Sequence, residues 1–392
     1  MREYIYMDNA ATTPVKEEVL EEMLPFFTEK YGNPSSIYSV AQNSKVAVEK
    51  AREKVAKAIG AKKEEIFFTA GGSEADNWAI KGIAYKNKNK GNHIITSKIE
   101  HHAVLHVCEY LEKKGFEVTY LDVDEDGIVD LEQLKSSIKD TTILITIMTA
   151  NNEIGTIEPI EEIGKIAKEH GVLFHTDAVQ AMGSIQMDVK AMNIDLLSMS
   201  AHKIYGPKGV GALYIRRGVQ LDSLVTGGGQ ERNKRAGTEN VPGIVGMGKA
   251  IELAYENLEE HNERLTKLRD RLMEKIEENI EEIKLNGHRT KRLANNVNFS
   301  FKYIEGESLL LSLDMVGIAG SSGSACTSGA LDPSHVLLAI GLSHEIAHGS
   351  LRLSLGDFNT EEEIDYVVKE LKTIVQRLRM MSPLYDKLEE EK

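Results

Sequence analysis

The sequence lacks the features that mark disulfide-rich, membrane-spanning, secreted and nucleic-acid-binding proteins. Its two cysteines are too few for a disulfide framework, so the cytosol is the expected compartment. No apolar run is long enough to span a membrane, and residues 1–8 lack the apolar core of a signal peptide. A formal net charge of −14 with no basic stripe argues against nucleic acid as a partner. We therefore expect a soluble globular protein that stays where it is made.

The length of 392 residues is enough for a large core and predicts two domains. Apolar residues at helical spacing from Ile251 to Ile283 predict one long amphipathic helix that leads into the second domain. Another helix is predicted at Glu361–Met380, and the last residues, Lys387–Lys392, are expected to fray. The prediction is a large domain at residues 14–256 and a smaller α+β domain at residues 1–13 and 257–392.

Strand and helix signals alternate through the large domain. Apolar and β-branched runs predict strands, and apolar residues at helical spacing predict the helices between them. The predicted strands are Glu65–Thr69, His93–Thr96, Thr141–Thr149, Val172–His175 and Ile194–Met199, and the predicted helices include Ser44–Ile59 and His101–Lys114. This alternation indicates an α/β fold with a mostly parallel sheet covered by helices, in which binding groups gather beyond the carboxyl ends of the strands.

One lysine lies at such a strand end. Lys203 follows the strand predicted at Ile194–Met199, and Gly206 with Pro207 forces a turn directly after it. A lysine in a partly desolvated pocket can lose its proton and form a Schiff base with a carbonyl compound, of which pyridoxal phosphate is the obvious example. A surface lysine in a glycine-rich turn is the alternative that this stretch leaves open.

A glycine turn that opens a helix follows the strand at Glu65–Thr69. The backbone N–H groups at Gly71 and Gly72, with the hydroxyl of Ser73, would suit a phosphate dianion. The turn is neither a Walker loop nor a dinucleotide fingerprint, because no Gly-Lys-Ser/Thr follows and the glycine spacing differs. A simple helix cap at Ser73 is the alternative. Pro14 is expected at the first position of another helix.

Polar side chains follow two further strands. Asn152 comes after Thr141–Thr149, while Asp177 and Gln180 come after Val172–His175. An aspartate beside a pyridine nitrogen keeps that nitrogen protonated and makes the ring an electron sink, and Gln180 could reach a ring hydroxyl. His101, at the start of a predicted helix, could face a cofactor with its ring or remain a solvated histidine.

The two cysteines have contrasting surroundings. Cys108 lies among apolar residues of a predicted helix and is interpreted as a buried, inert side chain. Cys326 lies in a run of glycine and serine between Gly320 and Gly329, which predicts an exposed loop where a thiolate can reach a bound substrate. Those residues alone leave a reactive thiol and a harmless exposed thiol equally open.

Taken together and in this order, the motifs resemble those of the cysteine desulfurases of the nitrogen-fixation and iron–sulfur-assembly type, which are fold-type I pyridoxal phosphate enzymes. The resemblance runs through the whole chain and rests on eleven motifs rather than on any single one. They are Asp8–Pro14, Gly32–Ser36, Gly71–Asn77, Glu100–His101, Asn151–Gly155, His175–Gln180, Ser200–Gly209, Gly227–Glu231, Arg235–Asn240, Ser321–Ser328 and Arg352–Gly356.

The resemblance implies a role for each matching residue around pyridoxal phosphate. Lys203 would form the Schiff base, Asp177 would pair with the ring nitrogen, Gln180 would donate to the ring oxygen, and His101 would stack on the ring and help with proton transfer. The phosphate would be held by Gly72, Ser73, Ser200, His202 and, from the other subunit of a homodimer, Thr238. No metal ligand is implied.

The resemblance also implies the substrate and the reaction. Asn33, Asn152 and Arg352 would face the carboxylate of L-cysteine, with Asn152 also beside the cofactor. Cys326 would take the sulfur as a persulfide, release L-alanine and pass the sulfur to an acceptor protein for iron–sulfur cluster assembly or thiolation. A selenocysteine lyase, an aminotransferase of the same class, and a scaffold without turnover are the alternatives.

Two positions depart from the pattern of the resembling family. Ser73 stands where threonine is commoner, and Asp357 follows Gly356 where many relatives carry a basic residue. Neither change removes a group that the chemistry needs.

Overall fold

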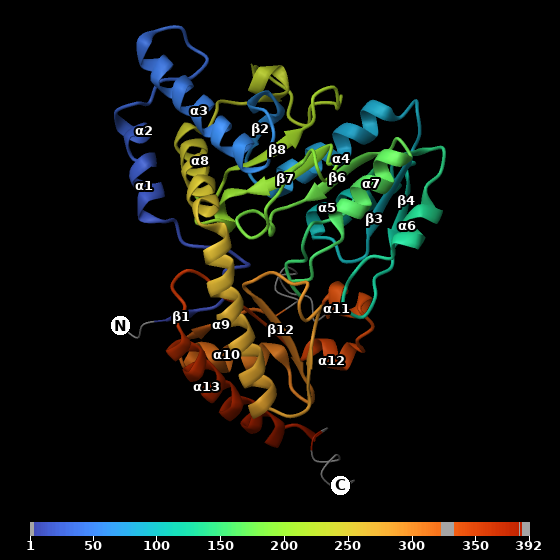
Figure 1. Ribbon diagram of the computed structural model, residues 1–392, viewed down its shortest axis with the longest axis vertical. Helices are drawn as coiled ribbons and strands as arrows, with labels where there is room; N and C mark the ends of the chain where they lie inside the picture. The colour runs from blue at the N-terminus through green and yellow to red at the C-terminus, as the bar shows by residue number, and fades with distance from the viewer. Residues whose placement is uncertain (1–3, 323–332, 384, 386–392) are drawn as a thin grey trace.

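The computed structural model describes residues 4–322, 333–383 and 385 (Figure 1). Cys326 and the predicted frayed end at Lys387–Lys392 lie outside the described residues. Within the described ranges, no helix is both long enough and apolar enough to cross a membrane.

A seven-stranded sheet forms the centre of the larger part, in the order β2-β8-β7-β6-β5-β3-β4. β8 runs antiparallel to both its neighbours, and the other pairs are parallel, as predicted. Helices cover both faces of such a sheet, so its inner strands are buried along their whole length. The strands are β2 (Ile66–Thr69), β3 (His93–Ser97), β4 (Glu117–Leu121), β5 (Thr142–Thr146), β6 (Leu173–Asp177), β7 (Leu196–Ser200) and β8 (Gly211–Ile215).

Two apolar cores, one on each face, hold the helices to this sheet. α4 (Gly72–Asn87) and α5 (His102–Glu112) pack on one face, where Trp78 and Cys108 are fully buried. The other face is covered by α1 (Glu17–Met23), α2 (Pro25–Thr28), α3 (Ser39–Ala58), α6 (Leu131–Ser137), α7 (Ile160–Glu169) and α8 (Val241–Glu256).

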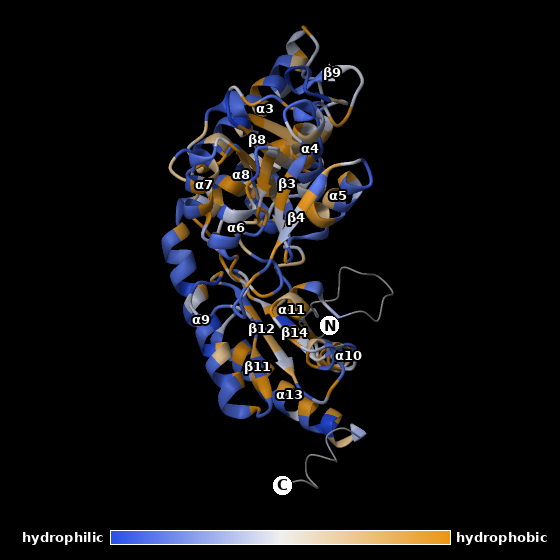
Figure 2. Cartoon of the chain, turned by 90° about the vertical axis from the view of Figure 1, so that its right-hand side faces the viewer, coloured by the Kyte–Doolittle hydropathy of each residue, from blue (hydrophilic) through white to orange (hydrophobic). Residues whose placement is uncertain are grey.

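The carboxy-terminal part has its own core around a three-stranded antiparallel sheet, in the order β11-β12-β14. α9 packs its apolar side on that core and turns hydrophilic residues outward (Figure 2). Strand β1 (Ile5–Tyr6) joins this part by pairing with β13 (Ile318–Ala319). The other elements are β11 (Ile283–Leu285), β12 (Asn296–Phe301), β14 (Ser350–Ser354), α9 (Leu258–Asn279), α10 (Gly306–Met315), α11 (His335–Ala339), α12 (His344–His348) and α13 (Glu361–Met380).

The prediction of one long helix from Ile251 to Ile283 is wrong. α8 ends at Glu256, Asn257 has φ −132° and ψ 42°, and α9 begins at Leu258. The apolar spacing continues through the break because α8 packs on the core of the larger part and α9 on that of the smaller part. Ile283 already belongs to β11. The division into domains at residues 256 and 257 stays a prediction, and that division coincides with this joint.

Two further boundaries differ near the site. Pro14 does not start a helix, since α1 begins at Glu17. The segment before α1 is bonded instead to residues 201–206, which contain Lys203 and which we call the lysine turn, through Thr13 N and His202 O at 3.0 Å. β6 extends two residues beyond the predicted strand, because pairing with β7 continues to Asp177. Both differences bring polar groups to the same edge of the sheet.

Candidate active site

A cavity of about 480 Å³ opens at the carboxyl ends of β5, β6 and β7. Its volume lies in the range of small-molecule and cofactor sites. It is lined by ten of the predicted site residues: Gly72, Ser73, His101, Asn152, Asp177, Gln180, Ser200, His202, Lys203 and Arg352. The carboxyl edge of one sheet thus gathers residues that lie up to 280 positions apart, from Gly72 to Arg352.

Lys203 lies where the sequence predicted it, in the short 3₁₀ helix Ala201–Lys203 that follows β7. Its Nζ donates to the carbonyl oxygens of Ala10, at 2.5 Å, and Ala11, at 2.7 Å. The reading of Lys203 as a surface lysine is excluded, because its side chain lines the cavity.

Asp177 and Gln180 follow one another along the cavity wall. Asp177 ends β6, and its Oδ1 accepts a hydrogen bond from Val179 N at 2.9 Å. Burial raises the pKa of the Asp177 carboxyl, while the Val179 N–H and the charge of Lys203 act in the opposite direction. Gln180 Nε2 donates to the Ala10 carbonyl at 3.0 Å, so its amide is engaged with the same oxygen as Lys203.

Two histidines in the cavity are held neutral. His101 is the N-cap residue of α5, and its Nδ1 accepts from Ala103 N at 3.1 Å, which leaves the ring proton on Nε2. Burial, followed by the charge of Lys203, lowers the pKa of His101 to about 4 and that of His202 to about 4. A neutral His101 ring can stack on an aromatic cofactor and exchange a proton through Nε2.

The start of α4 forms one end of the cavity. Gly71 is the N-cap residue and α4 begins at Gly72, so the alternative that Ser73 caps the helix is wrong. A Cβ atom at Gly72 would lie 2.7 Å from Val179 Cγ2, which explains the glycine there. The first N–H groups of a helix lack partners within it, and Ser73, Ser200 and His202 surround them. This end suits a dianionic group.

Arg352 lies in the middle of β14 and reaches the opposite end of the cavity. Its Nη2 donates to Asp8 Oδ1 at 2.9 Å and its Nη1 to the Asn152 carbonyl at 2.9 Å. The Arg352 Nε has no hydrogen-bond partner within the described residues, although the side chain is only 6% exposed. The guanidinium is therefore fixed in place, and its planar fork suits a carboxylate.

Two predicted site residues among those the structure describes do not line this cavity. Asn33 is exposed, and its Oδ1 accepts from the backbone N and Oγ of Ser35. Thr238 is also exposed, two residues after β10 (Arg235–Ala236), which pairs with β9 (Gly229–Gln230). Cys326 lies outside the described residues, so its position relative to Lys203 stays a prediction.

One carboxyl group in the cavity wall, that of Asp76, was not predicted from the sequence. Asp76 is 1% exposed, and its Oδ1 has no hydrogen-bond partner in the described part of the chain. His175 Nε2 lies 3.7 Å away but carries no charge, since burial lowers the pKa of His175 to about 3. Burial and the charge of Asp177 raise the pKa of Asp76, which favours its neutral form. Its spacing of four residues from Gly72 on one helix was the available signal.

Known proteins resemble this chain over nearly its whole length. Residues 5–367 match the family described as Aminotransferase class-V. A cysteine desulfurase IscS of Clostridium botulinum is 66% identical over 388 residues, 98% of each chain. A solved structure titled NifS-like protein covers 96% of this chain and 100% of its own at 43% identity, with a TM-score of 0.90. Another, titled SspA in complex with cysteine, covers 91% and 100% at 40% identity, with a TM-score of 0.80. These likenesses confirm the expected fold class and the resemblance.

Proposed function

We propose, because the chain belongs to the aminotransferase class-V family, that it is a cysteine desulfurase that converts L-cysteine to L-alanine. The observation that carries the proposal is the convergence of ten predicted residues on one cavity, among them Lys203 at a strand end. The name of one solved relative, in complex with cysteine, supports the same substrate.

The residues of the cavity fit pyridoxal phosphate, the cofactor of this family. Lys203 can bind its aldehyde carbon, Asp177 its ring nitrogen, and the start of α4 with Ser200 and His202 its phosphate. The orphaned Oδ1 of Asp76 also supports a bound group with polar atoms. When bound, this cofactor takes up the electrons of a bond broken at the substrate α carbon.

The other steps of the reaction are carried out by residues of the chain, each with its own role. Arg352 and Asn152 hold the substrate carboxylate, which places the α carbon near Lys203. Lys203 Nζ removes the α proton, and His101 Nε2 assists the later proton movements. The Cys326 thiolate attacks the sulfur of L-cysteine, so the carbon–sulfur bond breaks and a sulfur–sulfur bond forms. A C–H bond replaces the broken bond, which leaves alanine and a persulfide.

The choice of Cys326 as nucleophile is supported by the state of the other cysteine. Cys108 is fully buried, and burial, with nearby acidic groups, raises the pKa of its thiol. A thiol that is neither exposed nor ionised does not attack a substrate. Cys326 remains as the sulfur acceptor by chemistry, and its glycine-rich surroundings fit that role.

The test compares two variants that each lose one thiol. The purified protein loaded with pyridoxal phosphate is given L-cysteine, and alanine and protein-bound sulfur are measured. Wild type and Cys108→Ala should form alanine and gain about one sulfur atom per chain, which a reductant removes. Cys326→Ala should bind the cofactor but gain no sulfur. Persulfide on Cys108, or undiminished alanine from Cys326→Ala, would contradict the assignment.

The same assay separates the alternatives in this family. An aminotransferase would form no persulfide, and a scaffold protein would form no alanine. A selenocysteine lyase would act on L-selenocysteine and leave L-cysteine intact. Turnover of L-cysteine with sulfur on Cys326 excludes all three.

The surface supports a homodimer. Large apolar side chains of α1, α2 and the following loop are exposed, among them Leu24 (53%), Phe27 (58%) and Ile37 (94%). On the same surface, Gln230 Nε2 donates to Ser35 Oγ at 3.4 Å, so the loop of Asn33 lies beside the β9–β10 hairpin. Asn33 and Thr238 would then complete the site of the partner subunit. Light scattering that gives the mass of one chain in a fully active protein would exclude this.

The sulfur that the enzyme releases needs an acceptor. Persulfide sulfur passes to another thiol, so a sulfur-acceptor protein of iron–sulfur cluster assembly or thiolation is the proposed partner, and the cytosol the proposed compartment. Transfer of labelled sulfur from L-cysteine to a scaffold protein in a purified mixture tests this, and retention of all label on the enzyme contradicts it.

A further inference from the structure

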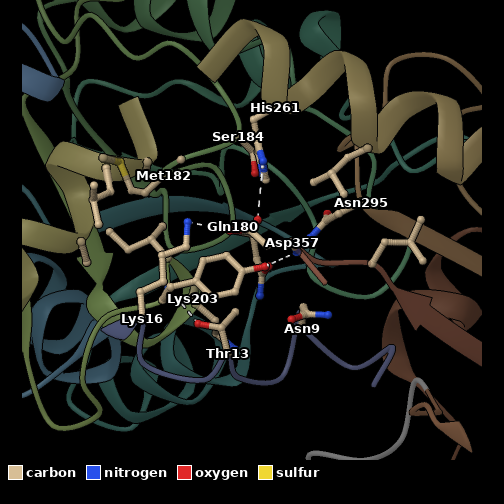
Figure 3. A pocket seen from close by; sticks show the side chains of 18 of the residues that line it. Asn9, Thr13, Lys16, Gln180, Met182, Ser184, Lys203, His261, Asn295 and Asp357 are labelled. Carbon is tan, nitrogen blue, oxygen red and sulfur yellow. Dashed lines mark hydrogen bonds and ion pairs between the residues drawn. The ribbon is translucent and has the colours of Figure 1, made fainter. Parts of the chain in front are cut away.

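A second cavity, of about 230 Å³, lies on the other side of Lys203 (Figure 3). Lys203 and Gln180 line both cavities and so form the wall between them. We call the first the front cavity and the second the rear cavity. The rear cavity lies where the lysine turn, the α8–α9 joint and the segment after β14 meet, and its lining includes Lys16, Lys203, His261 and Asp357.

The charged side chains of the rear cavity converge on Asp357 (Figure 3). Its Oδ2 pairs with Lys16 Nζ at 2.6 Å, with side chains 18% and 29% exposed, and its Oδ1 lies 3.5 Å from His261 Nδ1. The Asp357 backbone N–H donates to the Tyr205 hydroxyl oxygen at 2.7 Å. Asp357 therefore binds Tyr205 of the lysine turn through its backbone and Lys16, just before α1, through its side chain.

Tyr205 has an uncommon backbone conformation for a large residue. Its φ is +60°, a conformation that persists only where the surroundings hold it. Its N–H donates to Thr13 Oγ1 at 2.8 Å, its carbonyl accepts from Lys16 N at 3.1 Å, and Lys16 Nζ lies 4.8 Å from its ring centroid. Tyr205 is thus fixed at its backbone, its ring and its hydroxyl.

The segment that carries Asp357 is held just as tightly. A Cβ atom on Gly356 would lie 2.6 Å from the Tyr205 hydroxyl oxygen, so only glycine permits this approach. Arg264 on α9 donates to three backbone carbonyl oxygens of this segment, those of Gly356 (3.2 Å), Asp357 (3.1 Å) and Asn359 (3.2 Å). The contact between the two segments is therefore close and rigid.

This contact joins the two ends of the substrate site. Tyr205 follows Lys203 by two residues, and Asp357 follows Arg352 by five. The lysine that would move the α proton and the arginine that would hold the carboxylate belong to different parts of the fold. A displacement of about 1 Å between such groups costs up to about a hundredfold in rate.

We propose that Tyr205 and Asp357, with Lys16, are positioning residues that set the separation between Lys203 and Arg352. None of the three lines the front cavity, and they act through the two segments that they join. The proposal rests on the proposed function for the roles of Lys203 and Arg352.

The first test removes one hydroxyl group. The loaded enzyme is incubated with L-alanine in D₂O, and exchange of the α proton is followed by NMR, which needs Lys203 and Arg352 but not Cys326. Tyr205→Phe should slow this exchange roughly tenfold or more while cofactor binding stays unchanged. The control is Tyr366→Phe, which loses a hydroxyl bonded to Val316 O at 3.1 Å and should exchange at the wild-type rate.

A second readout does not depend on activity. Hydrogen–deuterium exchange of the peptide containing Asp357 should be faster in Tyr205→Phe than in wild type or Tyr366→Phe, because the Asp357 N–H loses its acceptor. Unchanged protection of this amide would contradict the contact itself.

A charge exchange separates positioning from a general loss of stability. Lys16→Asp and Asp357→Lys should each slow α-proton exchange, and the double variant should recover most of the loss because the ion pair is restored in reverse. A double variant as slow as the two single losses combined, or wild-type exchange in Tyr205→Phe, would overturn the proposal. A wild type that neither exchanges the proton nor forms alanine would instead overturn the proposed function, and the amide exchange would then test the link alone.

Discussion

The front and rear cavities share one wall but satisfy their polar groups in different ways. In the front cavity, Asp76 Oδ1 and Arg352 Nε are buried without a hydrogen-bond partner among the described residues. In the rear cavity, Asp357 Oδ1 is likewise buried without such a partner, but its Oδ2 pairs with Lys16 Nζ and its backbone N–H donates to Tyr205. Buried polar groups without partners are costly, so the front cavity, with two such side chains and about 480 Å³ of space, suits a polar ligand. The rear cavity has about half that volume, and the contacts of Asp357 with Lys16 and Tyr205 join one part of its wall to another.

The largest effect should come from Lys203, one of the two residues that line both cavities. Lys203→Ala removes the group that would bind the cofactor and move the α proton, so alanine formation should fall by roughly 10²–10⁴-fold. The rear contacts do not involve its ammonium group, so the Asp357 amide should stay protected from deuterium exchange. Alanine formation is measured against Lys249→Ala, whose lysine pairs with Glu252 on the surface of α8. A Lys203→Ala variant as active as that control would contradict the role of Lys203 in the front cavity.

A smaller effect is expected at the substrate end of the front cavity. Arg352→Lys keeps the charge but cannot contact Asp8, the Asn152 carbonyl and a carboxylate with one planar group. The KM for L-cysteine should rise about tenfold, with cofactor binding unchanged. Arg377→Lys, at a guanidinium bonded to Ser312 Oγ at 3.1 Å, is the control. If KM stays constant while cofactor binding weakens, Arg352 has a different role.

The smallest effect concerns the pH dependence of stability beneath the front cavity. Glu100 is fully buried, and burial raises its pKa from 4.5 to about 8, although its Oε1 accepts from Ser97 Oγ and Met148 N. A raised pKa means that its contribution to stability is complete below pH 4.5 and is lost as the pH rises through 8.

Glu100→Gln has no proton to lose and should escape this change. Its melting temperature relative to wild type should be higher at pH 9 than at pH 5 by about 3–5 °C. The exposed Glu125→Gln should show no such difference. A Glu100→Gln variant that loses stability relative to wild type on going from pH 5 to pH 9 would mean that the carboxylate form is the favoured one.

The site residues whose positions could be predicted are those that follow from the few residues next to them in the chain. Lys203 directly follows a buried strand, Asp177 ends another, and the glycines before Ser73 open a helix. Each position depends on local backbone preferences and on the rule that parallel strands present their carboxyl ends at one edge. The resemblance to a known family added Arg352, Ser200 and His202, which local patterns alone did not identify.

Other features depend on contacts that no local pattern contains. The break at Asn257 lies inside an unbroken apolar repeat and arises because the two helices pack on different cores. The positions of Asn33 and Thr238 outside the cavity reflect how one chain folds, before any partner is added. Asp357 was visible only as a departure from the pattern of relatives.

The sequence by itself determined three features: the alternation of buried strands and helices, the lysine at a strand end, and the glycine turn that suits a phosphate. It could do so because hydrophobic periodicity and backbone freedom act over a few residues. Only the tertiary structure decided that Asp76 lies beside Asp177 and that Tyr205 meets Asp357 behind the lysine. The reason is physical: burial, charge and hydrogen bonding depend on distances between segments more than a hundred positions apart, and sheet order and core packing set those distances.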